Sequence, residues 1–250
     1  MIILRKYSID DRYRYLSKSQ SDGEQDKFYR NGYYYKLNKV GNEGYVEHLV
    51  SVLLSCTDLY KDDYVYYEYC RINSKLGCRC KDFVNNGGQF LTASKIYERY
   101  IGSDSLSEKI AGLGNATARL KFLIDLYSLV GIDKRVALSY FRKIFLLDYV
   151  IVNTDRHVRN IGVVNYGGRY SPAPIFDNGC ALDTNRMGVA TSCTISGSFS
   201  EQLIATGYPI QPIFRVNTKL LMQKLANEPN LYEKAMLIGR LKTAINEGLI

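Results

Sequence analysis

Three oxygen-bearing side chains follow one another at short spacing in the second half of the chain. Asn160 comes five positions after Asp155, and Asp177 comes seventeen positions after Asn160. Phosphoryl transfer uses such a set, because one carboxylate orients the acceptor hydroxyl while an amide oxygen and a second carboxylate hold Mg²⁺. The Asp-to-Asn spacing equals the D-x-x-x-x-N pattern of kinase catalytic loops. We therefore predict Asp155 as the catalytic residue and Asn160 and Asp177 as the metal ligands.

The alternative is that these residues only shape turns. Asp and Asn are common turn residues, and the segment Asp-Asn-Gly at 177–179 is typical of a β-turn. The elements around them favour the catalytic interpretation. Residues 144–152 form a buried apolar run before Asp155, and the turn at 165–168 joins two short strands that would return Asp177 to Asn160.

A kinase also needs a cation for the nucleotide phosphates and a helix carboxylate to hold that cation. Lys36 ends the second strand of a predicted hairpin, and Glu47 lies on the helix that follows, on the same stripe as apolar residues. We predict this pair as nucleotide-binding. Lys39 and Glu43 are the competing pair, placed second because both fall in the connecting loop.

The catalytic loop contains further charged residues. His157 is one of two histidines and is a candidate either for general base or, as we favour, for hydrogen-bonded support of the loop. Arg156 and Arg159 could each contact phosphate oxygens or lie exposed to solvent, and solvent exposure is favoured for Arg159. Arg156 is also a candidate, with His157, for support of the loop.

The small, polar segment 17–23 precedes the hairpin and could cover phosphates through its backbone N–H groups. Ser19 and Ser21 are the predicted nucleotide-binding residues of this segment. The signal is limited to composition, because the segment has one glycine and neither a G-x-G-x-x-G nor a Walker pattern.

The elements that must position these residues fall into two groups. Residues 28–37 place Asn-Gly between aromatic runs, which predicts a hairpin. A helix over 45–56 and a strand over 64–69 complete a small lobe, residues 1–90. Helices over 117–130, after Asp133 and from 217 onward predict a mostly helical lobe, residues 91–250. The fold class is therefore α+β, with an antiparallel-sheet N-lobe carrying one helix.

Composition narrows the class of protein. A net charge of +8 suits phosphate-bearing partners, but the positive residues are spread along the chain, so nucleic acid is permitted rather than indicated. Six scattered cysteines indicate reduced thiols. No signal peptide or membrane span is visible, which predicts a cytoplasmic protein, with a secreted effector lacking a visible signal as the alternative. Nothing in the sequence indicates the oligomeric state.

With these residues assembled, the chain resembles the HipA-like serine/threonine kinases, whose fold is similar to that of phosphatidylinositol 3- and 4-kinases. Residues 154–160, Thr-Asp-Arg-His-Val-Arg-Asn, resemble the D-R-H-x-x-N catalytic loop. Residues 174–179 resemble the segment of the metal-binding aspartate. Residues 35–47 are similar to the lysine strand and the following helix. The resemblance covers about 17–183.

The resemblance implies a two-lobed kinase fold that binds ATP and Mg²⁺ and acts on a protein substrate. It assigns catalysis to Asp155, the metal to Asn160 and Asp177, and the phosphates to Lys36. Some members autophosphorylate a serine in the phosphate-covering loop, which makes Ser17, Ser19 and Ser21 candidates.

Two departures and two alternatives accompany this resemblance. Longer toxin kinases of the family carry an extra N-terminal subdomain, so a compact, stand-alone form is expected here. Asp177 precedes Asn-Gly and not Phe-Gly, so the motions of an Asp-Phe-Gly segment are not expected. A phosphoinositide kinase keeps the chemistry and changes the acceptor. A nucleotide-binding pseudokinase, or a DNA-associated regulatory module, keeps only the binding.

Overall fold

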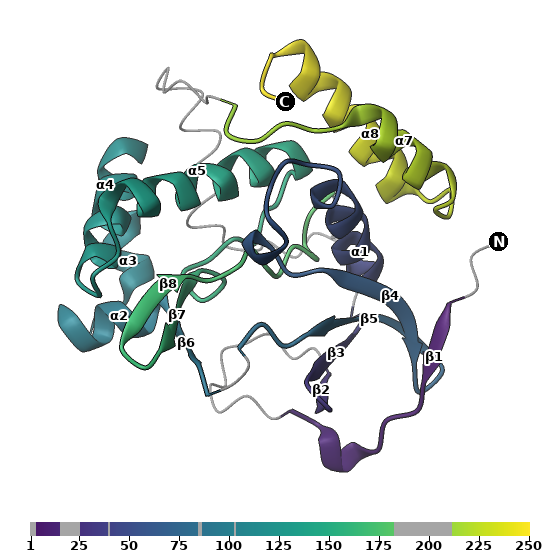
Figure 1. The fold of residues 1–250 in the computed structure, drawn as a ribbon, viewed down its shortest axis with the longest axis horizontal. Coiled ribbons are helices and arrows are strands. Elements are labelled where there is room, and N and C mark those ends of the chain that lie inside the picture. Colours follow the sequence, from purple (N-terminus) through teal and green to yellow (C-terminus); the bar gives the residue numbers. More distant parts are fainter. Residues whose placement is uncertain (1–3, 16–25, 40, 85–86, 103, 183–211) are drawn as a thin grey trace.

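The computed structural model describes residues 4–15, 26–39, 41–84, 87–102, 104–182 and 212–250. They form an α+β structure in two lobes (Figure 1). A five-stranded sheet with one helix makes the smaller lobe, and helices with a three-stranded sheet make the larger one. None of the described helices has the length and hydropathy needed to cross a bilayer.

The sheet of the small lobe has the strand order β1-β4-β5-β3-β2. Its strands are β1 (Arg5–Tyr7), β2 (Lys27–Arg30), β3 (Tyr33–Leu37), β4 (Tyr67–Ile72) and β5 (Lys75–Lys81), with short 3₁₀ turns at Asp11–Tyr13 and Lys61–Asp63. Neighbours are antiparallel except β1, which runs parallel to β4. The predicted β2–β3 hairpin is confirmed: Asn31 and Gly32 both have the positive φ that a type I′ turn requires.

The predicted strand over residues 64–69 is wrong in its start, since β4 begins only at Tyr67. Tyr64 and Val65 pair instead with Ile175, through a parallel bridge and a 2.9 Å backbone hydrogen bond. This pairing links the start of β4 to the segment that leads into Asp177.

Helix α1 (Glu43–Leu54) is buried on nearly every side, because it lies between the sheet and the C-terminal helices. Its first turn rests directly on β5: a Cβ atom added to Gly44 would lie 2.5 Å from the backbone carbon of Gly77. The Asn38 side chain, just after β3, also accepts a 2.8 Å hydrogen bond from the Gly44 amide. Small residues and this polar contact therefore fix α1 against β3 and β5.

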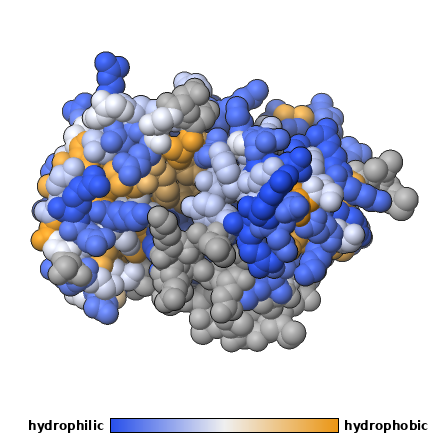
Figure 2. All heavy atoms as spheres, turned by 90° about the horizontal axis from the view of Figure 1, so that it is seen from below, coloured by the Kyte–Doolittle hydropathy of each residue, from blue (hydrophilic) through white to orange (hydrophobic). Residues whose placement is uncertain are grey.

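The larger lobe confirms the helices expected from the sequence. Its helices are α2 (Ala93–Tyr100), α3 (Leu106–Ala111), α4 (Ala116–Ser128), α5 (Lys134–Ile151), α7 (Thr218–Ala226) and α8 (Tyr232–Asn246). Asp133 caps α5 by accepting hydrogen bonds from the amides of Arg135 and Val136. One hydrophobic core runs from α1 through these helices, so the lobes share packing. From below, apolar side chains gather on the left half of the surface, the side of the helical lobe (Figure 2).

The second sheet belongs to the larger lobe, where it lies beside α2, and has the order β6-β7-β8 (Figure 1). Its strands are β6 (Gln89–Thr92), β7 (Gly162–Tyr166) and β8 (Arg169–Pro172), all antiparallel. The β7–β8 hairpin is the one predicted around residues 165–168. Strand β6 was not predicted. It spans the proposed division at residue 90 and pairs with a strand about 70 residues further along the chain.

Candidate active site

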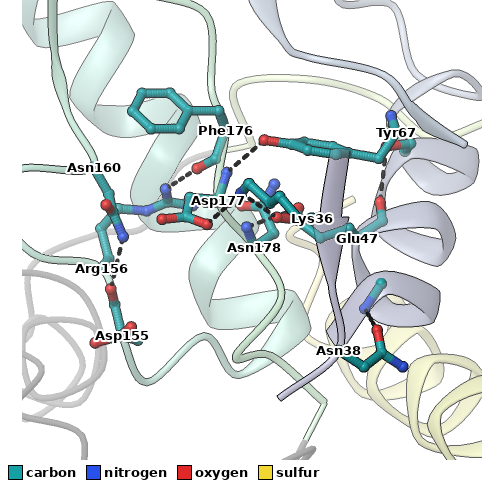
Figure 3. A network of polar contacts seen from close by, with 12 residues as sticks. Lys36, Asn38, Glu47, Tyr67, Asp155, Arg156, Asn160, Phe176, Asp177 and Asn178 are labelled. Carbon is teal, nitrogen blue, oxygen red and sulfur yellow. Dashed lines mark hydrogen bonds and ion pairs between the residues drawn. The ribbon is translucent and has the colours of Figure 1, made fainter. Parts of the chain in front are cut away.

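The small lobe contributes a buried cation held by two carboxylates. Lys36 of β3 places its Nζ atom 3.2 Å from Glu47 Oε1 on α1 and 2.7 Å from Asp177 Oδ1. The side chains of Lys36 and Glu47 are 11% and 3% exposed. The structure thus brings together three predicted site residues that are up to 141 positions apart in the chain, as Figure 3 shows.

Backbone amides and a tyrosine complete this side of the site. Glu47 uses its second oxygen to accept a 2.9 Å hydrogen bond from the Asn178 amide. The Tyr67 ring lies 5.0 Å below Lys36 Nζ in a cation–π contact, and its hydroxyl accepts from the Asp177 amide at 3.4 Å. The two hydrogen bonds join α1 and β4 to the segment after β8, and the cation–π contact joins β4 to β3. The two lobes are therefore tied together at Asp177.

The charges of the cluster are mutually dependent. Burial opposes the ionisation of Asp177, but the adjacent Lys36 ammonium holds its pKa well below the ordinary value. Burial also opposes the protonation of Lys36, yet Asp177, Tyr67 and Glu47 raise its pKa well above the usual range. Burial raises the pKa of Glu47, and Lys36 counteracts this. Lys36 and Asp177 are therefore charged at neutral pH.

The loop that carries Asp155, predicted as the catalytic loop, begins at a strained residue. Helix α5 ends at Val152, which has a left-handed φ of 52°, a conformation that is unusual for a β-branched side chain. Asn153 then folds back: its side chain donates a 3.0 Å hydrogen bond to Asp148 and accepts a 3.1 Å bond from the Asp155 amide. The sharp turn out of α5 thus fixes the position of Asp155.

Arg156 is fully buried, so its predicted contact with phosphate oxygens and the alternative of solvent exposure are both wrong. Its guanidinium donates to both oxygens of Asp148, at 3.1 and 3.0 Å. It also donates to the Phe176 carbonyl and to the Asn178 side-chain oxygen (Figure 3). The other interpretation, support of the loop, agrees with these contacts, because Arg156 joins α5 to both neighbours of Asp177.

Asp155 and Asn160 lie on one short turn. The Asn160 side-chain nitrogen donates a 3.2 Å hydrogen bond to the Asp155 carbonyl, which directs the amide oxygen away from that bond. Burial raises the pKa of Asp155, with His157 opposing and Asp177 adding to the rise. Burial lowers the pKa of His157 despite the nearby Asp155 and Asp177. The Arg159 amide donates to His157 Nδ1 at 3.3 Å, so the imidazole is engaged with its own loop.

An aromatic cluster supports the residue before Asp177. The Phe176 ring lies 5.5 Å from the rings of both Phe83 and Phe90, and it packs against the buried group around Tyr67 and Cys80. Asp177 itself has a φ of 60°. Such conformations are most accessible to Asn and Asp, and they occur often at functional sites. The anchored ring and the positive φ together direct the carboxylate toward Lys36.

The oxygen-bearing side chains of the site suit a magnesium ion. The carboxylates of Asp155 and Asp177 and the amide oxygen of Asn160 are hard oxygen ligands, the type that Mg²⁺ prefers. Within the described residues, His, Cys, Asp and Glu side chains form no group of three that could hold a metal by themselves. Mg²⁺ is usually bound through one or two carboxylates and completed by substrate phosphates and water. Asn160 and Asp177 are therefore suitable ligands for such an ion.

A cavity of about 460 Å³ opens beside the catalytic loop. It is lined by Asp155, His157 and Arg159 from the loop, by Glu98 and another residue of α2, by Asp104 from the link between α2 and α3, and by the start of α3. The cavity is polar, and its lining carries three carboxylates against one guanidinium. It gives a second molecule access to Asp155 from the side of the helical lobe.

Glu43 and three serines are the remaining residues predicted from the sequence. The Glu43 carboxylate accepts hydrogen bonds from the amides of Lys39 and Gly41, and so shapes the start of α1. Ser17, Ser19 and Ser21 lie outside the described residues.

Sequence reasoning missed several buried polar residues of the site. Asp148, Asn153, Tyr67 and Asn178 take part in its hydrogen bonds. A signal existed for Asp148, which is the one charged residue in the apolar run 144–152. A buried charge requires a partner, so this residue indicated a buried cation nearby.

No family model matches the sequence, and no curated protein matches it. Solved structures do. The proinflammatory kinase CtkA of Helicobacter pylori aligns with a TM-score of 0.63 and 14% identity, over 98% of this chain and 95% of that one. HipA of Shewanella oneidensis MR-1, solved with HipB and its operator DNA, aligns with a TM-score of 0.53 and 13% identity, over 96% and 68%.

These alignments extend over nearly the whole chain and concern the fold. The expected likeness to HipA-like kinases is confirmed at that level. The chain adopts the two-lobed, protein-kinase-like fold of CtkA and HipA, with a small sheet lobe and a mostly helical lobe.

Proposed function

We propose that this protein is a kinase that transfers the γ-phosphoryl group of ATP, with Mg²⁺, to Ser or Thr hydroxyls of a protein. The observation that carries the proposal is the contact of Lys36 with both Glu47 and Asp177. A lysine held by a helix carboxylate, next to a metal-binding aspartate, is the arrangement that phosphoryl transfer requires. The kinase fold of the two similar structures supports the same conclusion.

Each residue has one role in this mechanism. Asp155 orients the acceptor hydroxyl and receives its proton as the oxygen attacks the γ-phosphorus, while the bond from that phosphorus to the β–γ bridging oxygen breaks and ADP leaves. Bound Mg²⁺, held by Asn160 and Asp177, would neutralise charge on the phosphates. Lys36 offers its ammonium to the phosphates, and Glu47 keeps that ammonium in place.

Electrostatics support this division of roles. Asp177 has a depressed pKa and so remains a carboxylate that can bind a cation. Burial raises the pKa of Asp155, and a base whose pKa is raised toward the working pH accepts a proton more readily in the transition state. Two neighbouring carboxylates are thus shifted in opposite directions, a pattern that often separates a base from a charged ligand.

The acceptor would approach Asp155 through the cavity beside α2 and α3. Its acidic lining suits a polypeptide hydroxyl better than a phosphoinositide head group, whose phosphates the carboxylates would repel. Ser17, Ser19 and Ser21 remain candidate autophosphorylation positions within the same proposal.

Mass spectrometry after incubation with ATP and Mg²⁺ tests the proposal. The protein with a general Ser/Thr substrate should gain phosphate, and Asp155→Ala or Asp177→Ala should reduce transfer at least 10³-fold, on the order of the effect of removing catalytic groups. Asp62→Ala, an exposed carboxylate on a 3₁₀ turn, is the matched control. Unchanged transfer by either active-site variant would contradict the assignment.

A further inference from the structure

Two lysines face each other across the first hairpin. Lys27 of β2 is the direct cross-strand partner of Lys36 of β3. The Leu37 amide donates to the Asp26 carbonyl in the adjacent pair, so the lysines form a non-hydrogen-bonded pair, the kind whose side chains approach most closely. Directly opposed side chains have Cβ atoms about 4.5–5.5 Å apart.

The neighbours of Lys27 place it on the face of the sheet that looks into the site. Phe28 points to the opposite face, where it is buried with Tyr35. Tyr29, two residues after Lys27, contacts Tyr34, which lies two residues before Lys36, with ring centroids 4.8 Å apart. Alternation along both strands therefore puts Lys27 and Lys36 on one face.

Like charges that face each other directly across strands are destabilising. Lys36 has its own counter-charges, because it binds Glu47 and Asp177. Lys27 forms no ion pair within 4.0 Å with any described residue. Among the described residues, the pair thus leaves one cation without a counter-charge of its own.

We propose that Lys27 is a second phosphate-binding residue, which contacts the polyphosphate of the nucleotide beside Lys36. The inference rests on the proposed function, since it assumes that a nucleoside polyphosphate is bound at this site. The Lys36 ammonium is already shared between the carboxyl groups of Glu47 and Asp177. Phosphates added beside them need a further cation, and Lys27 supplies it from the neighbouring strand.

Equilibrium binding of ATP, ADP and AMP with Mg²⁺ tests this role without relying on turnover. Lys27→Gln should weaken ATP and ADP binding about tenfold, as expected for loss of one charge-assisted phosphate contact. AMP binding should change less than threefold, because AMP lacks the polyphosphate. Lys27→Arg should stay within about threefold of wild type, since it keeps the charge.

The control is Lys6→Gln, which removes the same charge from exposed β1 at the opposite edge of the sheet. Ligand-free Lys27→Gln should melt within about 2 °C of wild type, because repulsion by Lys36 and attraction by Asp177 oppose each other. A purely structural lysine would instead lower the melting temperature and affect all three nucleotides alike.

The outcomes separate the two proposals. If wild type binds ATP and the Lys27→Gln variant binds it with equal affinity, the role of Lys27 is overturned and the kinase proposal stands. An equal loss for ATP and AMP, or a loss in Lys27→Arg as large as in Lys27→Gln, overturns it too. Wild type that binds no nucleotide overturns the proposed function, and this inference with it.

Discussion

Replacing Asp148 by Asn should destabilise the protein strongly, although the residue touches neither of the proposed substrates. Asp148 and Arg156 are both 0% exposed in their side chains and form a bidentate pair. The other partners of Arg156 that the hydrogen bonds identify are neutral oxygens, of Phe176 and Asn178. An Asn at position 148 keeps the shape of the side chain and removes the negative charge that compensates the guanidinium.

The magnitude follows from the burial. Removing one partner of a buried ion pair costs about 3–5 kcal/mol, because the remaining charge cannot return to water. Asn still offers one acceptor oxygen, so we expect the lower end, about 3 kcal/mol. That is a large share of the roughly 5–15 kcal/mol that stabilises a typical domain. For a chain of this length it corresponds to a fall in melting temperature of about 6 °C or more.

Urea denaturation followed by circular dichroism measures the change in the free energy of unfolding. Asp125→Asn is the matched control: Asp125 pairs with Lys134 at 2.6 Å, but these side chains are 45% and 67% exposed. The same substitution there should cost only about 0–1 kcal/mol. Arg156→Met added to Asp148→Asn should cost less than the sum of the single losses, by at least about 1 kcal/mol, because no unpaired charge remains.

Equal losses for Asp148→Asn and Asp125→Asn would refute the reasoning, since burial would then make no difference to the value of the pair. Additive losses in the double variant would also refute it. In that case the destabilisation would come from packing and hydrogen bonding at each site separately.

Two further predictions concern α1. His48 lies between a β4 carbonyl at 3.0 Å and Glu228 at 3.1 Å; burial opposes its protonation, but Glu228 raises its pKa. The contact of protonated His48 with Glu228 should contribute fully to the free energy of unfolding below about pH 6.5, and this contribution should be lost as the pH rises through the raised pKa of His48. Glu228→Gln should abolish this pH dependence, which urea titrations at several pH values measure. Gly44→Ala should cost about 1–3 kcal/mol in the same assay, because its Cβ would meet Gly77 at 2.5 Å, whereas Gly239→Ala, with open space around it in α8, should be neutral or stabilising. A cost for Gly239→Ala as large as that for Gly44→Ala would contradict the steric argument.

The local elements and the kinds of side chain at the site could be predicted from the sequence alone. Asn31-Gly32 specifies its hairpin through backbone conformation alone, and Asp133 marks the start of α5 by capping it. The spacing from Asp155 to Asn160 places both residues on one short turn, where the Asn160 side chain donates to the Asp155 carbonyl. Such features depend on neighbours within a few residues, so they can be recognised without knowledge of the fold.

The ion pairs, the strand pairing and the burial at the site depend on contacts between distant segments, and only the tertiary structure shows them. It places Lys36 against Asp177 across 141 positions, pairs β6 with β7, and selects Lys36 over Lys39 and Glu47 over Glu43. It also buries Arg156, a residue type that is almost always exposed and for which the sequence allowed a phosphate contact. Burial, pairing and pKa are set by the charges and oxygens that packing brings together, and no local pattern records which these will be.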